Sequence, residues 1–150
     1  MADIKSPEAR SRNMAKIRST DTKPEVWLRK QLFSIGYRYR KNVKTVPGHP
    51  DIWLGKYHAA IFVHGCFWHR HEGCKYAYMP KSCVEFWSEK FRRNMARDHE
   101  VMLQLNELGI RTVIVWECTI VRAMKSSEEK SKLMQQLHEF LISEDRKLVL

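Results

Sequence analysis

The feature that most restricts the fold is the apolar run Ala59–Val63, which leads directly into a segment rich in histidine and cysteine. An uninterrupted apolar run of this length is typical of a strand buried on both faces, so it predicts a central strand. The segment that follows, residues 64–83, is longer than a simple connection, which indicates a functional loop or one tied by a metal. The fold must therefore present a histidine- and cysteine-rich loop at the end of a central strand.

A helix is predicted to begin after Thr22. Thr22 can cap it, Pro24 suits its first turn, and Glu25 completes a capping box. Gly36 should end the helix, and its buried side should carry Leu28, Leu32 and Ile35. Glu25 lies at the end of that buried stripe. It is therefore either only the capping partner or a carboxylate at a metal or water site.

The remaining patterns predict a mixed α/β fold of one 150-residue domain. Strands are predicted at 37–40, 51–54, 59–63 and 111–116, with Glu117 and Cys118 closing the last. A helix at 84–108 should place on one side Trp87, Phe91, Met95, Met102 and Leu105. A helix at 128–142 should turn inward Leu133, Leu137, Phe140 and Leu141. Three early strands without intervening helices indicate a hairpin-containing mixed sheet flanked by helices.

Positive charge is concentrated near the N-terminus. Residues 1–50 carry 12 Lys and Arg against 4 Asp and Glu, whereas residues 51–150 carry 15 against 13. A concentrated basic segment is the footprint expected for a phosphate backbone, although RNA, an acidic partner, a membrane surface or a solvated face are alternatives. The longest apolar runs are too short to span a bilayer and the N-terminus has no apolar signal region, which predicts an intracellular soluble protein.

Residues 1–22 are predicted to form a basic arm that contains one short helix. Met14 and Ile17 form its narrow apolar stripe, surrounded by basic side chains that include Lys16 and Arg18. Such a stripe cannot hold a helix without a partner, so the arm either docks on the main domain or orders on DNA.

The four cysteines predict a metal site. In a reducing compartment, cysteines favour metal ligation or free thiols over disulfides. The ligand set predicted for zinc is Cys66, His71, Cys74 and Cys118. Cys83 is a competing ligand that would give four cysteines, and ordinary buried thiols are the alternative to any metal. Four protein ligands close the coordination sphere, so this zinc would brace the loop rather than catalyse.

Asp51, His64 and His69 remain for catalysis. Asp51 begins one predicted strand and His64 follows the end of another, so antiparallel pairing would bring both to the same sheet edge. A carboxylate there is a hard oxygen ligand for magnesium, and we expect it to make no folding contact. A nearby histidine has a suitable pKa to take a proton from water. The alternative is that one histidine is a core hydrogen bonder and the other lies on the surface.

Two aromatic side chains, Phe67 and Trp68, lie between Cys66 and His69. A rigid metal loop would hold them outward, where aromatics beside a basic surface can stack on bases or wedge between base pairs. Trp87, near the start of the long helix, could join them. The alternative is that these side chains form a local core around the zinc.

These residues resemble the very short patch repair endonuclease family. The matching pieces, which run from about residue 10 to 120, are Arg12-Asn13-Met14, Asp21-Thr22 with Glu25, Pro47-Gly48-x-Pro50-Asp51, Phe62-x-His64-Gly65-Cys66-Phe67-Trp68-His69, Glu85-Phe86-Trp87 and Val115-Trp116-Glu117-Cys118. The resemblance implies a restriction-endonuclease-like core of the PD-(D/E)xK superfamily. It implies a magnesium-dependent nick beside the thymine of a T:G mismatch, of the kind left by 5-methylcytosine deamination.

The resemblance also implies roles for individual residues. Asp51 would hold magnesium together with the main-chain carbonyl of residue 63, and His69 would be the general base, supported by His64 and Glu25. The structural zinc would be held by Cys66, His71, Cys74 and Cys118. The mismatch wedge would be Phe67, Trp68 and Trp87. The arm in the opposite groove would contact DNA through Met14, Lys16, Ile17 and Arg18.

Two departures and several partners complete the expectation. Val63 stands where the family pattern has Thr, and Gly73 is an extra residue between His71 and Cys74. The expected partners are double-stranded DNA with a T:G mismatch, mismatch-repair proteins and a repair polymerase, but no membrane. The expected form is a monomer in the bacterial cytoplasm, associated with the nucleoid. The rival functions are a related endonuclease without a mismatch requirement and a noncatalytic zinc module that binds DNA.

Overall fold

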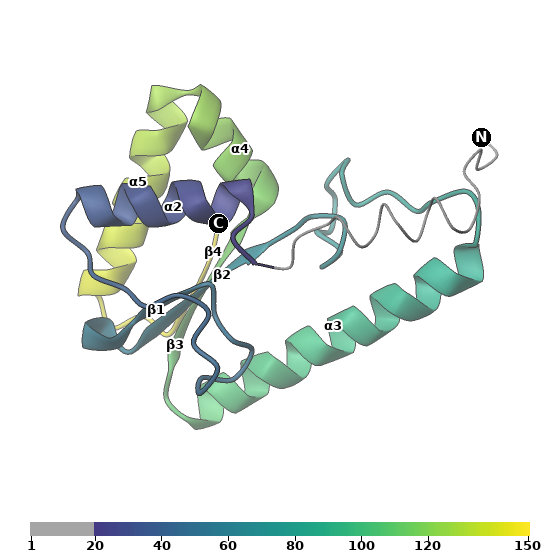
Figure 1. Ribbon diagram of the computed structural model, residues 1–150, viewed down its shortest axis with the longest axis horizontal. Helices are drawn as coiled ribbons and strands as arrows, with labels where there is room; N and C mark the ends of the chain where they lie inside the picture. Colours follow the sequence, from purple (N-terminus) through teal and green to yellow (C-terminus); the bar gives the residue numbers. More distant parts are fainter. Residues whose placement is uncertain (1–19) are drawn as a thin grey trace.

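In the computed structural model, which describes residues 20–150, a four-stranded mixed sheet separates two hydrophobic layers (Figure 1). The strands, in sheet order, are β1 (Ile52–Leu54), β2 (Ala59–His64), β3 (Arg111–Trp116) and β4 (Lys147–Val149). The helices are α2 (Lys23–Ser34), α3 (Val84–Glu107), α4 (Glu117–Lys125) and α5 (Ser127–Ile142), and a 3₁₀ turn, η1 (Gly55–Tyr57), joins β1 to β2. This arrangement confirms the predicted fold class and suits a restriction-endonuclease-like core.

The central strand β2 is buried on both faces because each face is covered by helices. Ile61 packs with residues of α2, α4 and α5, whereas Ala60 and Phe62 pack with Leu105 of α3. Figure 1 shows α2, α4 and α5 on one side of the sheet and α3 on the other. The uninterrupted apolar run of this strand follows from that two-sided covering.

The strand pairing brings the candidate residues to one edge of the sheet. β1 and β2 are antiparallel with Ile52 opposite Ile61, so the residue before β1 lies near the end of β2. β2 and β3 are parallel, and their last residues, His64 and Trp116, are paired. The chain segments that follow β2 and β3 therefore leave the sheet at the same edge, next to Asp51.

Two predictions near α2 are wrong in detail. Ile35 is exposed, because the helix ends at Ser34 and the non-helical backbone of Ile35 (φ −101°) takes its side chain off the buried stripe. Residues 37–40 do not form a strand. Only Arg40 makes an isolated bridge, to Trp53, while Tyr37 is held against α5 by a contact between its hydroxyl and His138 Nδ1 (2.5 Å).

Three further differences concern the second half of the chain. Glu117 and Cys118 do not close a strand but begin α4, which the sequence patterns missed together with the short strand β4. Met95 was expected on the same side of the helix as Phe91 and Leu105, but unlike these two residues it is exposed. The reason is that α3 packs on the sheet near its C-terminal end and extends past it at the other (Figure 1). The predicted inward residues of α5 are all buried, namely Leu133, Leu137, Phe140 and Leu141.

The predictions for the N-terminal arm lie largely outside the described residues. These include the short helix around Met14 and Ile17 and the DNA contacts of Met14, Lys16, Ile17 and Arg18. Within residues 20–150, none of the helices combines the length and apolarity that crossing a membrane would require.

Candidate functional site

A cleft of about 470 Å³ opens at the edge of the sheet where β2 ends. Four titratable groups of the cleft come from separate parts of the chain: Asp51 precedes β1, His64 ends β2, His69 lies in the following loop and Asp98 belongs to α3. The structure therefore brings together all three residues predicted for catalysis. It adds Asp98, which the sequence patterns did not single out.

Asp51 is tied to the sheet by its carboxylate. The Val63 main-chain N–H donates to Asp51 Oδ2 over 2.7 Å, so the expectation that Asp51 makes no folding contact is wrong. Burial and the nearby charge of Glu25 raise the pKa of Asp51 to about 7, against the opposing effects of the Val63 hydrogen bond and Arg29. A cation in the cleft would favour the ionised form.

The turn before Asp51 needs glycine at residue 48. Gly48 has φ +79°, and a Cβ atom there would lie 2.5 Å from Val101 Cγ1 of α3 and 3.0 Å from Phe62 Cε1. Both the backbone conformation and the close approach exclude a side chain. This contact seats the turn between β2 and α3, and so positions Asp51 in the cleft.

His69 is oriented from two sides. Its Nδ1 lies 2.7 Å from Asp98 Oδ2, and its ring stacks on that of His64 with centroids 3.9 Å apart and planes 7° apart. A carboxylate on Nδ1 leaves Nε2 as the atom that can accept a proton. Burial and the neighbouring His69 lower the pKa of His64 to about 4, so His64 is neutral near pH 7.

Asp98 could have been found from helical spacing. It lies seven residues after Phe91 and seven before Leu105, and both of these residues are buried. Positions separated by two turns share one face of a helix. A carboxylate on the buried face of an otherwise apolar stripe is the signal that sequence reasoning missed.

Glu25 reaches the same cleft from the start of α2. Its side chain is 3% exposed, and Glu25 Oε2 accepts a hydrogen bond from the Asp21 main-chain N–H over 2.9 Å. Thr22 occupies the N-cap position without a side-chain capping bond, so the expected capping box between Thr22 and Glu25 is not formed. Burial raises the pKa of Glu25. This effect is opposed first by a side-chain hydrogen bond with Thr22 and then by the positive charge of Arg29, whose Nη2 lies 3.7 Å from Glu25 Oε2.

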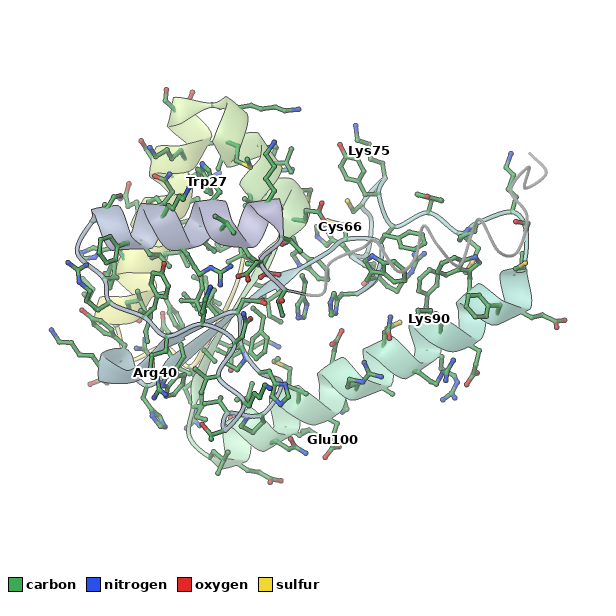
Figure 2. All side chains as sticks on the ribbon, viewed as in Figure 1. Trp27, Arg40, Cys66, Lys75, Lys90 and Glu100 are labelled. Atoms are coloured by element: carbon green, nitrogen blue, oxygen red, sulfur yellow. The ribbon has the colours of Figure 1, made fainter. Side chains whose placement is uncertain are left out.

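A second group of ligand atoms lies beside the cleft. The sulfur and imidazole atoms of Cys66, His71, Cys74 and Cys118 all lie within 4.8 Å of one another. His71 Nδ1 is 3.5 Å from both Cys66 Sγ and Cys118 Sγ. Figure 2 shows Cys66 at the point where the loop leaves the sheet. Three thiols and one imidazole are the donor chemistry of a closed tetrahedral metal site.

The members of this cysteine–histidine cluster differ in their surroundings. Burial raises the pKa of the Cys66 thiol to about 12, whereas a hydrogen bond from the Tyr76 backbone lowers the pKa of Cys74. Burial lowers the pKa of His71, which keeps its imidazole neutral and able to ligate. Cys83 is exposed at the start of α3 and is not a member of the cluster.

Stacked rings connect the cysteine–histidine cluster to the cleft. The His71 ring lies parallel to that of Trp116, with centroids 4.2 Å apart and planes 6° apart. The Trp116 ring in turn meets His64 edge to face, with centroids 5.4 Å apart, and His64 stacks on His69. The two groups are therefore neighbours across the end of β3.

The predicted aromatic residues gather between the loop and α3. Phe67 contacts Trp68, Trp87 and Phe91, with ring centroids 5.1, 5.4 and 5.1 Å apart. Only Phe91 is buried, while Phe67, Trp68 and Trp87 are half-buried. Asn94 Nδ2 donates to the Trp68 carbonyl over 3.2 Å, which ties the loop to α3. The aromatic cluster thus has a packed base and a partly open surface.

Comparisons with known proteins assign the family. The family described as DNA mismatch endonuclease Vsr matches residues 2–75. The type II nicking enzyme V.NmeAIP of Neisseria meningitidis serogroup A is 42% identical over 137 residues, covering 91% of this chain and 97% of the relative. The type II nicking enzyme V.XorIIP of Xanthomonas oryzae pv. oryzae is 44% identical, covering 80% and 88%. The DNA mismatch endonuclease Vsr of Escherichia coli K12 is 38% identical over 144 residues, covering 96% and 90%. Because such relatives span nearly the whole chain, it belongs to the DNA mismatch endonuclease Vsr family and is a DNA endonuclease.

Proposed function

We propose that the protein makes a magnesium-dependent nick in duplex DNA beside the thymine of a T:G mismatch, as in very short patch repair. The observation that carries this proposal is the juxtaposition of Asp51 with the His69–Asp98 pair in one cleft. A carboxylate for a hard cation and an oriented imidazole for a proton are the two groups that hydrolysis of a phosphodiester requires. The noncatalytic zinc module has no use for this combination.

The donor set of the cleft suits magnesium. Asp51 would supply a carboxylate, and Val63, which also lines the cleft, would supply its main-chain carbonyl. Magnesium commonly uses only one or two protein carboxylates together with water and phosphate oxygens. When bound, the ion would stabilise the negative charge that develops on the phosphate during hydrolysis. Replacing Thr by Val at residue 63 leaves this carbonyl in place.

His69 is assigned as the general base. Asp98 holds its Nδ1, so Nε2 is free to take the proton of the attacking water. His64, neutral and stacked on His69, holds the imidazole plane and is a positioning residue. Glu25 is assigned a supporting role, because its carboxylate adds negative charge near Asp51 and raises the pKa of Asp51.

The cysteine–histidine cluster is assigned to structural zinc. Its three sulfurs and one nitrogen match the ligands that zinc prefers, and four protein ligands leave no open position for catalysis. Such an ion would hold the loop that carries Phe67, Trp68 and His69, and it would join that loop to α4 through Cys118. In this role zinc binding is folding free energy of the loop.

The half-buried aromatic residues Phe67, Trp68 and Trp87 are assigned to the mismatch. Unstacking a base step costs a few kcal/mol, roughly, and costs least where pairing is already defective. These aromatic side chains have a packed base and a partly open surface. This arrangement favours the wedge role over the alternative that they only form a closed local core around the zinc. The word mismatch in the name of the E. coli relative also favours it over an endonuclease without a mismatch requirement. The repair partners, the monomeric state and the nucleoid location stay predictions.

One assay tests the proposal. T:G and matched duplexes of otherwise identical sequence, each labelled on one strand, are incubated with the protein with and without magnesium. We expect one nick, on the thymine strand of the T:G duplex, only with magnesium. Equal cutting of both duplexes would establish the related endonuclease without mismatch preference, and no cutting of either with magnesium would favour the noncatalytic module.

A further inference from the structure

Arg70, between the general base His69 and the cluster ligand His71, has contacts that the proposed function does not use. Its Nη1 donates to the Phe67 carbonyl and to the Tyr78 carbonyl, each over 3.1 Å, and its Nη2 donates to the Ala77 carbonyl over 2.7 Å. The guanidinium carbon also lies 3.9 Å from the centroid of the Phe91 ring on α3. The side chain is therefore engaged by backbone oxygens and by an aromatic face.

These contacts join three separate segments at the aromatic cluster. The Phe67 carbonyl belongs to the start of the loop, Ala77 and Tyr78 belong to its later part, and Phe91 belongs to α3. A planar guanidinium can donate in several fixed directions while it stacks on a ring, which a lysine ammonium cannot do. Arg70 also has a φ of +55°, a rare conformation for a residue with a side chain, and it persists where surrounding contacts over-determine it.

We propose that Arg70 is a positioning residue that determines mismatch specificity by holding Phe67 and Trp68 in their half-buried arrangement, and that it is not a phosphate contact. This inference rests on the proposed wedge role of the aromatic residues. Phe67 is fixed by Arg70 at its carbonyl, and Trp68 is fixed by Asn94 from α3. With both backbone ties in place, the aromatic rings meet DNA already ordered, so less conformational entropy is lost on binding.

The phosphate alternative is natural for an arginine in a DNA-binding protein, but the geometry opposes it. The side chain is half-buried, and its two terminal nitrogens already donate to three carbonyls. To bind a phosphate, Arg70 would have to release loop carbonyls that lie against the aromatic cluster. Lys75, which is exposed in the same loop, offers a charge without such ties and is a matched control.

The experiment compares Arg70→Lys, Arg70→Met and Lys75→Met with the wild type. Dissociation constants are measured for T:G and matched duplexes at several salt concentrations, and the metal content of each protein is determined. We expect both Arg70 variants to reduce the ratio of T:G to matched affinity by on the order of tenfold, the effect of about one charged hydrogen bond. Matched affinity and its salt dependence should stay close to wild type. Lys75→Met should weaken both duplexes slightly and leave the ratio unchanged.

The two Arg70 substitutions separate the positioning role from the phosphate role. Lysine keeps the positive charge but loses the planar set of guanidinium donors, and methionine loses both. If Arg70→Lys keeps the full T:G preference, charge is sufficient and the positioning role is overturned. If Arg70→Met weakens both duplexes equally and reduces the salt dependence, Arg70 is a phosphate contact. If either variant loses metal, the duplex comparison is repeated on that variant reloaded with zinc, so that the T:G preference is measured with the cluster occupied. An unchanged preference in the reloaded protein would overturn the proposal.

A measurement without DNA distinguishes failure of this inference from failure of the proposed function. Acrylamide quenching of tryptophan fluorescence is compared between wild type and Arg70→Lys, with the same pair in a Trp68→Phe background to isolate Trp68. We expect Trp68 to become more accessible in Arg70→Lys. If the wild type shows no T:G preference, the proposed function fails, but a change in quenching would still support the positioning of Trp68. If quenching is unchanged, Arg70 does not position Trp68.

Discussion

The loop after β2 contributes to two groups of ligand atoms that differ in chemistry. The cysteine–histidine cluster gathers three thiols and one imidazole within 4.8 Å. The cleft combines the carboxylates of Asp51 and Asp98 with the imidazoles of His64 and His69, and it opens to solvent. His69 and His71 are only two residues apart, yet they belong to different groups.

The difference teaches what surroundings do with one residue type. His71 stacks on Trp116, and its Nδ1 faces thiol sulfurs rather than a carboxylate like the one that Asp98 presents to His69. His69 faces a carboxylate and an open cleft, so its second nitrogen can take part in proton transfer. A closed set of soft ligands braces a structure, whereas an incomplete set beside a cleft can react. The predictions below separate these two behaviours.

The largest expected effect is on catalysis, from Asp51→Ala. Removing the carboxylate takes away the proposed magnesium ligand, which is worth several kcal/mol, roughly a thousandfold or more in rate. The Val63 N–H also loses its acceptor, so Asp51→Asn is the matched variant that can keep a hydrogen bond there. Both variants should lose nicking but bind DNA and keep the cluster metal. Substantial nicking by either variant at saturating magnesium would remove Asp51 from the site.

His69→Ala tests the reactive histidine of the pair and should be the next largest effect. Loss of a general base commonly slows a reaction by about 10²–10⁴-fold. Asp98→Asn should slow nicking less than His69→Ala does, because an amide can still contact His69 Nδ1. It should still slow nicking, because a neutral amide cannot stabilise the imidazolium. The measurement is the single-turnover nicking rate as a function of pH. If His69→Ala keeps the wild-type rate and pH profile, the proton goes to His64 or to solvent.

The cysteine–histidine cluster and the cleft could be predicted from the sequence to different degrees. The members of the cysteine–histidine cluster were predicted because their residue types are restrictive. Asp51 and its histidines were predicted because the β1–β2 hairpin brings them together locally. Helical spacing places Asp98 on the buried face of α3, but its contact with His69 could not be predicted, since that contact depends on how α3 crosses the loop. The Arg70 contacts were missed for a similar reason, because their acceptors are backbone carbonyls that carry no residue signature. The expected strand at 37–40 failed where packing of Tyr37 on α5 overrode an alternating pattern.

Cys118→Ser tests the closed set and should affect stability more than chemistry. The cluster joins the loop to the first turn of α4 through Cys118, so loss of one thiolate should release the metal and the loop. We expect one zinc per wild-type chain, none in the variant, and a lower melting temperature. Cys83→Ser is the control and should keep both zinc and melting temperature, because Cys83 is not in the cluster. Wild-type protein purified without chelator that contains no zinc would contradict the assignment.

Trp68→Ala should have a smaller effect, confined to discrimination between duplexes. The wedge is expected to favour T:G over matched DNA, so its loss should narrow the affinity gap, by about 1–3 kcal/mol at most if one base stack is lost. The comparison uses paired binding curves at fixed salt, with Trp53→Phe as a control at a tryptophan of β1, outside the aromatic cluster. Equal weakening of both duplexes would make Trp68 a packing residue of the loop.

The smallest expected effect concerns the charge of Asp51 in protein without magnesium. Its pKa is about 7 in the folded chain, above the ordinary value of 3.8, so between these values the folded state binds more protons than the unfolded state. Stability attributable to this group therefore falls as pH rises from about 4 to about 7, and stays low above that. Asp51→Asn lacks this cost, so it should melt higher than wild type at pH 8 and show a smaller advantage at pH 5, where only part of the cost has developed. A gain of about 1 kcal/mol would raise the melting temperature by about 2–4 °C in a chain of this size.

Magnesium should raise the melting temperature of the wild type alone, because only the wild type keeps the carboxylate. An advantage of Asp51→Asn that is equal at both pH values would mean that the carboxyl is not the group that titrates.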